Sequence, residues 1–221
     1  MLKSSWNRDP RDWNRDPRET TGRASERNGT TRMKRRASSP PDAEAPGPGQ
    51  ESVWDYPRPP RLEASSRLVE VRFGGILLAA SRRAMRVLET SHPPVYYVPP
   101  EDVRMEYLLP SDRQSWCEWK GLASYYHLEA PAAAAAAAGA AGGGAAGASA
   151  RRRAENGAWY YPDPTVPYKE IRNYIAFYPH AVDACYVDGE QVQAQPGDFY
   201  GGWITRDVVG PFKGGPDTSH W

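Results

Sequence analysis

The stretch RLVEVRFGGILLAA, from Arg67 to Ala80, decides the fold class. Apolar and charged residues alternate before Gly74–Gly75, and a second apolar run follows the two glycines. Alternation with period two is typical of a strand with one buried face, and a pair of glycines between two such runs is a hairpin signal. The stretch therefore predicts two antiparallel strands joined by a tight turn.

Similar short runs fill the rest of the chain. AMRVLE (84–89) fits a helix or a strand, and we favour a strand; further strands are predicted at 95–98, in NGAWYYPDP, in IAFYP and in VDACYVDGEQV. Pro100 is followed by the carboxylates of Glu101 and Asp102, which is typical of a helix start, and we predict a helix that ends at Pro110. One or two helical turns are predicted in YKEIRNY. The count of roughly eight short strands and one or two short helices predicts a mainly β barrel or sandwich.

Two segments interrupt this pattern. Residues 1–50 carry 11 Lys and Arg against 7 Asp and Glu, and Leu2 is the one member of the Ile, Leu and Val set among them. Such a segment cannot bury enough apolar surface to offset its chain entropy, so we predict a disordered basic N-terminal arm. Residues 130–150 are Ala, Gly, Ser and one Pro. We predict that they form a flexible insertion in a surface loop of a domain that spans 51–221.

The arm contains a tandem heptad, WNRDPRD followed by WNRDPRE, at 6–19. One apolar residue and one proline per heptad argue against a coiled coil. A duplicated disordered stretch and a short linear motif anchored by Trp6 and Trp13 both remain open. KRR at 34–36 is too short to establish a nuclear signal.

Charge and hydropathy bear on partners and location. The whole chain has a net charge of +1, and the residues after 50 sum to −3, so nucleic acid is a disfavoured partner despite the basic run Arg151–Arg153. No apolar run reaches about 18 residues, and the N-terminus lacks an apolar signal segment. Two cysteines fit a reducing compartment. We expect a soluble, intracellular, cytoplasmic protein without a membrane partner, and leave the nucleus or an organelle open.

The stretch SWCEWKGLASYY, Ser115 to Tyr126, is the densest in chemistry-bearing residues. Strict alternation places Cys117 and Lys120 on opposite faces of a strand unless Gly121 turns the chain. Cys117 is therefore read first as a buried apolar thiol, and second as a weak candidate for a catalytic nucleophile that a nearby cation activates. Cys185, between Ala184 and Tyr186, is read as a core residue.

Aromatic density points to a ligand site. All 13 tyrosines and six of the 8 tryptophans follow residue 50. A small core cannot hide so many rings, because buried Tyr and Trp also need hydrogen-bond partners, so some are expected to line a concave surface. The candidate ligand-binding residues are Glu89, Tyr96, Tyr97, Glu118, Trp119, Lys120, Tyr125 and Trp159.

The sequence gives little support for a metal site or a cofactor site. The cysteines and histidines are scattered without the spacing that preforms a zinc site, so we predict no metal site and leave the cofactor unknown. His92, in SHPP, is read as an exposed loop histidine.

Several long motifs resemble one family. RFGG, RRAMRVLETSHPPVYYVPPEDV, CEWKGLASYY, AENGAWYYPDP and IAFYPHAVDACYVDGE follow one another in the order found in the family of domain of unknown function 427. The resemblance covers about residues 51–221 without the insertion. It implies a small single-domain, tent-like or barrel-like β-sheet with a short helix. The family is also filed under the label nucleotidyltransferase, a role that the lack of a metal-binding carboxylate pair disfavours.

The resulting functional prediction has two branches. The first is that the domain binds a small polar or aromatic ligand in the mouth of the sheet, with catalysis left open. The alternative is a protein-interaction or self-association module that uses its aromatic face, and this leaves a homo-oligomer open.

Overall fold

The computed structural model describes residues 40, 42–131, 151–218 and 221. The chain divides into two compact units, Met1–Arg35 and Arg36–Trp221, and only the second contains described residues. The tandem heptad, the KRR run, most of the predicted arm and most of the predicted insertion lie outside the described residues.

The Arg67–Ala80 stretch forms the predicted hairpin. Strands β3 (Val69–Phe73) and β4 (Ile76–Ser81) pair antiparallel, and the two glycines between them have φ values of 60° and 76°. Both values lie in the left-handed region, which glycine adopts without a side-chain clash. The inward residues of β3 are fully buried. The sheet continues from β3 to β11 (Ala184–Val187) and then, through a turn at Asp188–Gly189, to β12 (Glu190–Gln191).

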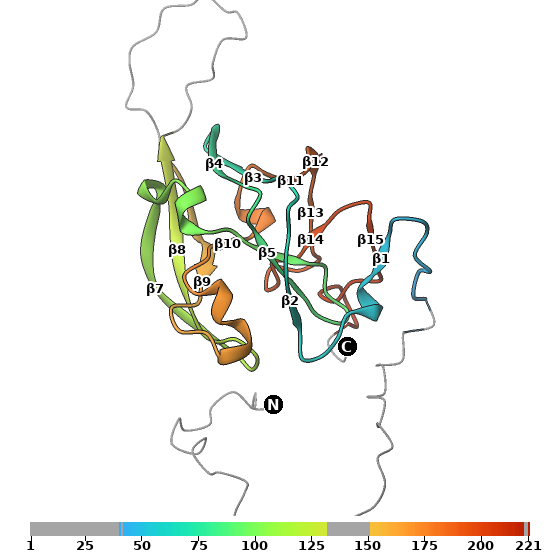
Figure 1. The fold of residues 1–221 in the computed structure, drawn as a ribbon. Helices are drawn as coiled ribbons and strands as arrows, with labels where there is room; N and C mark the ends of the chain where they lie inside the picture. Colours follow the sequence, from blue (N-terminus) through green and yellow to red (C-terminus); the bar gives the residue numbers. More distant parts are fainter. Residues whose placement is uncertain (1–39, 41, 132–150, 219–220) are drawn as a thin grey trace, which may run out of the picture. The chain divides into compact units, whose positions relative to one another are not determined.

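A second sheet has the order β10-β9-β8-β7. Its members are β7 (Leu108–Cys117), β8 (Gly121–Pro131), β9 (Arg151–Tyr160) and β10 (Ala176–Phe177). The three long strands run side by side (Figure 1). Pro131 pairs with Arg151, so residues 132–150 connect two neighbouring strands, and Ala130 belongs to β8 with 1% exposure.

A register shift in β8 between Tyr126 and Leu128 changes which side chains point inward. Strict alternation along the strand would place His127 on the same face as Tyr125. The structure instead buries Leu128 completely and leaves His127 half-buried. A bulge of this kind inserts an extra residue into one strand and reverses the pattern beyond it.

The third sheet has the order β2-β5-β6, from β2 (Arg61–Ala64), β5 (Met85–Leu88) and β6 (Val95–Tyr97). It confirms the strand in AMRVLE and the one beginning at Val95. Two small pairs complete the described part: β1 (Glu51–Ser52) with β15 (Val208–Val209), and β13 (Gln193–Ala194) with β14 (Trp203–Ile204). The mainly β class is confirmed, and none of the sheets formed by the described residues closes into a barrel.

The predicted helix from Pro100 to Pro110 is wrong. Two 3₁₀ helices, η3 (Pro100–Asp102) and η4 (Met105–Tyr107), replace it. Between them Val103 forms a β-bridge with Ala79, and the next backbone N–H donates to the carbonyl oxygen of Leu78 at 2.8 Å. Pairing with β4 therefore outcompetes the helix, and Pro110 falls in β7, an edge strand, where a missing N–H is tolerated. Three further 3₁₀ helices are η2 (Val53–Asp55), η5 (Val166–Ile171) and η6 (Pro179–Ala181).

The buried residues fall into separate clusters. The largest contains Trp203, Phe73 and Phe177, all fully buried, together with Tyr96 and Cys185. A second, which we call the aromatic cluster, consists of Val87, Tyr97, Ala123, Tyr125, Trp159, Tyr161, Tyr168, Ile171, Ala176 and Tyr178. The aromatic cluster joins the β2-β5-β6 sheet to the β10-β9-β8-β7 sheet, and the candidate site lies against it.

Candidate functional site

The turn between β7 and β8 carries the first residues of the site. Cys117 ends β7, Gly121 begins β8, and these two residues pair across the hairpin. Gly121 has a φ of 94°, so the three residues between them form a tight turn. Because β7 ends at Cys117, strict alternation does not extend to Lys120, and the alternative left open by the sequence, a turn at Gly121, is the one found.

Thr165 anchors the turn. Its hydroxyl donates to the carbonyl oxygen of Trp119 at 2.5 Å, and its N–H donates to the carbonyl oxygen of Lys120 at 3.2 Å. Both bonds hold backbone atoms. The Lys120 side chain therefore enters the protein from a fixed backbone position.

Lys120 is a buried charge. It is 7% exposed, and its ammonium lies 5.8 and 5.9 Å from the ring centroids of Tyr161 and Tyr168. Burial opposes the charge, but Tyr97, Cys117 and Glu89 together outweigh this effect and raise the pKa of Lys120. Within the described ranges, no carboxylate forms an ion pair with it.

The rings around this lysine form a continuous group. Trp159 packs on Tyr178 with ring centroids 4.4 Å apart, and Tyr97 lies 6.2 Å from Trp159 and 6.3 Å from Tyr161. The indole Nε1 of Trp159 donates to the hydroxyl of Tyr97 at 3.4 Å. Burial raises the pKa of both Tyr97 and Tyr161, which keeps the two phenols neutral.

Two polar features border the aromatic cluster. The Tyr125 hydroxyl and Ser115 Oγ are hydrogen-bonded at 2.7 Å, and the Arg113 guanidinium lies 4.6 Å from the Tyr125 ring centroid. Trp119 packs against the same cluster, but its indole Nε1 is buried without an acceptor in the described part of the chain. The indole N–H is thus an unsatisfied donor on the residue before Lys120.

Charged groups form a rim near Lys120. Glu89 pairs with Arg58 at 3.2 Å, and its charge also acts on Lys120, His92 and Lys213. Burial, and then the positive charge of Arg58, lower the pKa of Lys213. Glu118 is exposed on the turn and acts electrostatically on Lys213.

His92 belongs to this rim, and its prediction as an exposed loop residue is wrong. It is 9% exposed, its Nδ1 lies 3.0 Å from the carbonyl oxygen of Thr90, and its ring packs on Tyr200 with centroids 4.8 Å apart. Burial lowers the pKa of His92 and favours the neutral ring.

The structure brings together most of the predicted residues. Tyr97, Tyr125 and Trp159 belong to the aromatic cluster, Trp119 and Lys120 pack against it, and Glu89 and Glu118 belong to the rim. Tyr96 is the exception: it lies in the largest core cluster, 5.2 Å from Trp203 between ring centroids. Neighbours on a strand point to opposite faces, so Tyr96 and Tyr97 cannot share one site.

Tyr161, Tyr168, Arg58 and Lys213 were not predicted. The motif AWYYP contained a usable signal for Tyr161, because it lies two residues after Trp159 and would share a face with it on an extended chain. The other three come from segments far from the turn in sequence, and no local pattern marks them.

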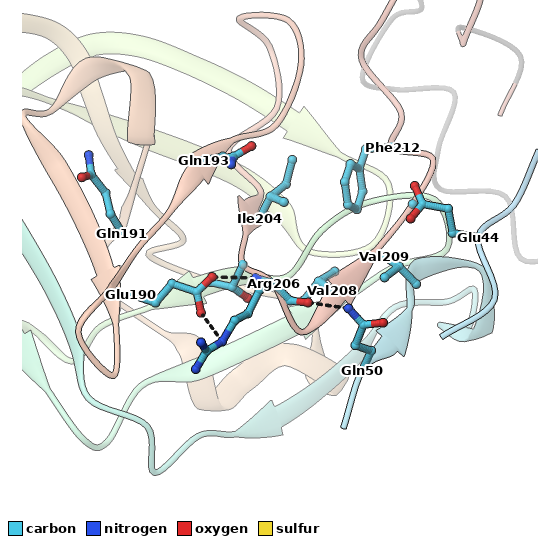
Figure 2. Close-up of a pocket in the computed structure, with 12 residues that line it drawn as sticks. Glu44, Gln50, Glu190, Gln191, Gln193, Ile204, Arg206, Val208, Val209 and Phe212 are labelled. Carbon is cyan, nitrogen blue, oxygen red and sulfur yellow. Dashed lines mark hydrogen bonds and ion pairs between the residues drawn. The ribbon is translucent and has the colours of Figure 1, made fainter. Parts of the chain in front are cut away.

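Two surface pockets lie elsewhere. One, with a volume of about 320 Å³, has Glu190 and Arg206 among its lining residues; Figure 2 shows their ion pair, at 3.4 Å, and the bond from Gln50 Nε2 to the Arg206 carbonyl oxygen, at 2.6 Å. The other, of about 450 Å³, contains Arg86 between Glu51 and Glu63. Neither pocket includes a predicted site residue, and these polar groups already pair with one another.

Other surface features have local partners. Arg151, Arg152 and Arg153 lie on β9 and pair with Glu129, Asp183 and both Glu129 and Glu155, respectively. Among the described residues, no three His, Cys, Asp or Glu side chains come together as metal ligands would. In the same ranges, no helix is long and apolar enough to cross a membrane.

The fold and the site define a small mainly β domain with a buried lysine and a cysteine at one hairpin turn. The family model of the domain of unknown function DUF427, labelled NTP_transf_9, matches residues 61–188, and the chain belongs to this family. The match extends from β2 to the turn after β11, so it includes the aromatic cluster and the turn from Cys117 to Gly121. It confirms the resemblance seen in the sequence. No curated protein matches the chain.

Proposed function

We propose that this domain binds a small ligand through an anionic or carbonyl oxygen at the Lys120 corner, by which we mean Cys117, Trp119, Lys120 and Tyr161. The observation that carries the proposal is the buried Trp119 indole N–H, which has no acceptor in the described part of the chain and stands next to the buried Lys120 in sequence. A buried N–H without an acceptor costs about 1–3 kcal/mol. A ligand with acceptor oxygens would satisfy the indole and could also bond to the ammonium.

Charged groups of both signs lie around the corner. Arg58 pairs with Glu89, and the Lys213 ammonium donates to an oxygen of Trp221, so Lys120 is the cation that an anionic ligand would meet at the corner itself. The neighbouring rings offer apolar contact area to the rest of the ligand. These features support the small polar or aromatic ligand expected from the sequence.

A thermal-shift screen with small carboxylates, phosphate esters and nucleotides tests the proposal. A ligand at about 100 times its dissociation constant should add roughly 2.7 kcal/mol to the unfolding free energy. Lys120→Gln should abolish the shift. Lys169→Gln, the same change at an exposed lysine of η5, should retain it. The proposal fails if no compound raises the melting temperature, or if the Lys120→Gln variant responds like the unmodified protein.

A second candidate function, self-association, is favoured by one observation. On the β7–β8 hairpin Trp116 and Leu122 are cross-strand partners, with 62% and 41% of their surfaces exposed. Packing this pair against the same pair of a second copy would bury both. Light scattering over a concentration series tests it: a dimer should form and weaken about tenfold on Trp116→Ser. A monomer at every concentration would refute it.

A further inference from the structure

The pocket drawn in Figure 2 is formed by residues of β12, β13, β14 and β15, by the loops between them and by the segment before β1. Its volume of about 320 Å³ suits a small ligand. The lining residues are Glu44, Gln50, Glu190, Gln191, Gln193, Ile204, Thr205, Arg206, Val208, Val209, Gly210 and Phe212. None of them lies within residues 61–188, so the pocket belongs to segments that flank the part matched by the family model.

Hydrogen bonds between distant segments hold the walls of this pocket. The Glu44 N–H donates to the carbonyl oxygen of Gly210 at 3.1 Å, and Gln50 Nε2 donates to the carbonyl oxygen of Arg206 at 2.6 Å. In addition, β13 pairs with β14, and β1 pairs with β15. The walls are therefore in place before a ligand arrives, which lowers the entropic cost of binding.

Part of the wall is apolar. Val208 and Val209 are buried, whereas Ile204 and Phe212 are half-buried and keep apolar surface free for a ligand. Figure 2 shows the Ile204 side chain and the Phe212 ring among the lining residues. An aromatic ring and a branched side chain offer contact area to a ligand with an apolar body.

The charged side chains of the lining are Glu44, Glu190 and Arg206. Glu190 is satisfied by Arg206, because one carboxylate oxygen lies 3.4 Å from the guanidinium Nε and the other accepts from the Arg206 backbone N–H at 2.6 Å. Within the described residues, no cation pairs with the exposed carboxylate of Glu44, and no group bonds to the side-chain amide of Gln193. Glu44 thus gives the pocket one excess negative charge.

We propose that this pocket binds small organic cations in which an apolar or aromatic body carries a primary ammonium. The ammonium donates to the Glu44 carboxylate, and the body packs on Ile204 and Phe212. Hydrogen bonds to a charged group are among the strong ones, and the face of an aromatic ring also attracts a cation. The ligand class is opposite in charge to the one proposed for the Lys120 corner, and the inference does not depend on that corner.

2-Phenylethylamine is the probe, because it joins a phenyl ring to a primary ammonium. A titration of the full chain followed by two-dimensional NMR measures binding at individual residues. We expect saturable shifts of the Gln193 side-chain amide and of the backbone amides of Ile204 and Val208. Phenylacetate, which has the same ring and a negative charge, should cause no saturable shift. The neutral 2-phenylethanol should bind about tenfold more weakly than the amine.

Variants assign the binding to the pocket. Glu44→Gln keeps the size of the side chain and removes its charge, so it should weaken 2-phenylethylamine binding about tenfold. Glu170→Gln, the same change at an exposed glutamate of η5, should leave the binding unchanged. Phe212→Leu should weaken it about threefold or more, since the ring is lost. Melting curves establish that each variant is folded, and if Glu44→Gln is not, the comparison of the amine with 2-phenylethanol decides the outcome.

Three results would overturn the inference: no saturable shift at these residues with the amine, binding of phenylacetate as tight as that of the amine, or unchanged affinity in folded Glu44→Gln. Lys120→Gln should retain the binding. Loss of binding in Lys120→Gln but not in Glu44→Gln would assign the amine to the Lys120 corner and refute the pocket.

Discussion

Replacing Lys120 by methionine tests how the buried ammonium affects the free energy of unfolding. Methionine has a similar length and volume but no charge, so the variant removes the ammonium and keeps the packing against Tyr161 and Tyr168. Because the pKa of Lys120 is raised in the folded protein, folding favours the charged form, and we expect the unfolding free energy of the variant to fall.

The magnitude follows from the contacts. Burying an ammonium has a cost, but at Lys120 the surrounding groups outweigh it, since the pKa is raised. Two cation–π contacts contribute at most about 2 kcal/mol each, and a thioether on the same rings recovers about 0.3–1.5 kcal/mol. We therefore expect Lys120→Met to lower the unfolding free energy by about 1–3 kcal/mol.

Urea unfolding followed by tryptophan fluorescence measures this change. An unchanged m value establishes that the midpoint shift reflects stability. Lys169→Met is the matched control and should stay within about 0.5 kcal/mol of the unmodified protein, because that lysine is exposed. A gain of about 1 kcal/mol or more in Lys120→Met would refute the reasoning, since it would mean that the ammonium is not compensated in the folded protein.

Three further predictions concern the surroundings of the site. Gly121→Ala should cost about 1–3 kcal/mol in urea unfolding through its φ of 94°, because an added Cβ would make only ordinary van der Waals contacts; no loss would contradict a strained turn. Gly201→Ala should cost about 1–3 kcal/mol, because its Cβ would lie 2.2 Å from the Trp159 ring, and an unchanged midpoint would mean that the ring moves freely. His92 has a lowered pKa when folded, so stability should fall as the pH drops below about 6.5 towards the folded value. His92→Phe should flatten that pH dependence, and an identical slope in both proteins would exclude His92 as its source.

Strands could be predicted from the sequence where all the signals that define them lie within one short stretch. The Arg67–Ala80 hairpin combined alternation with a glycine pair, and both signals act within the stretch itself. The segment after Pro100 had equally good local helix signals, yet Val103 pairs with Ala79 of a distant strand. Local patterns cannot report such a partner, because the pairing energy belongs to two segments at once.

The candidate site shows the same limit. Residue types predicted that aromatic and charged side chains would gather, but strand alternation could not separate Tyr96 from Tyr97 without knowledge of which face of β6 meets the aromatic cluster. The position of Lys120 depended on where β7 ends, and a three-residue turn reverses the side to which the side chain points. Arg58 and Lys213 approach the turn only after the chain has folded.

The attachment of residues 132–150 has a practical consequence. They join the chain at Pro131 and Arg151, whereas the Lys120 corner adjoins Gly121 at the other end of β8, roughly 30 Å away along an 11-residue strand. A fluorophore, an affinity tag or a whole reporter domain can therefore be grafted between those two ends without crowding the corner. The hairpin offers a handle for immobilising the protein or for reporting on it while ligands are screened at the opposite end.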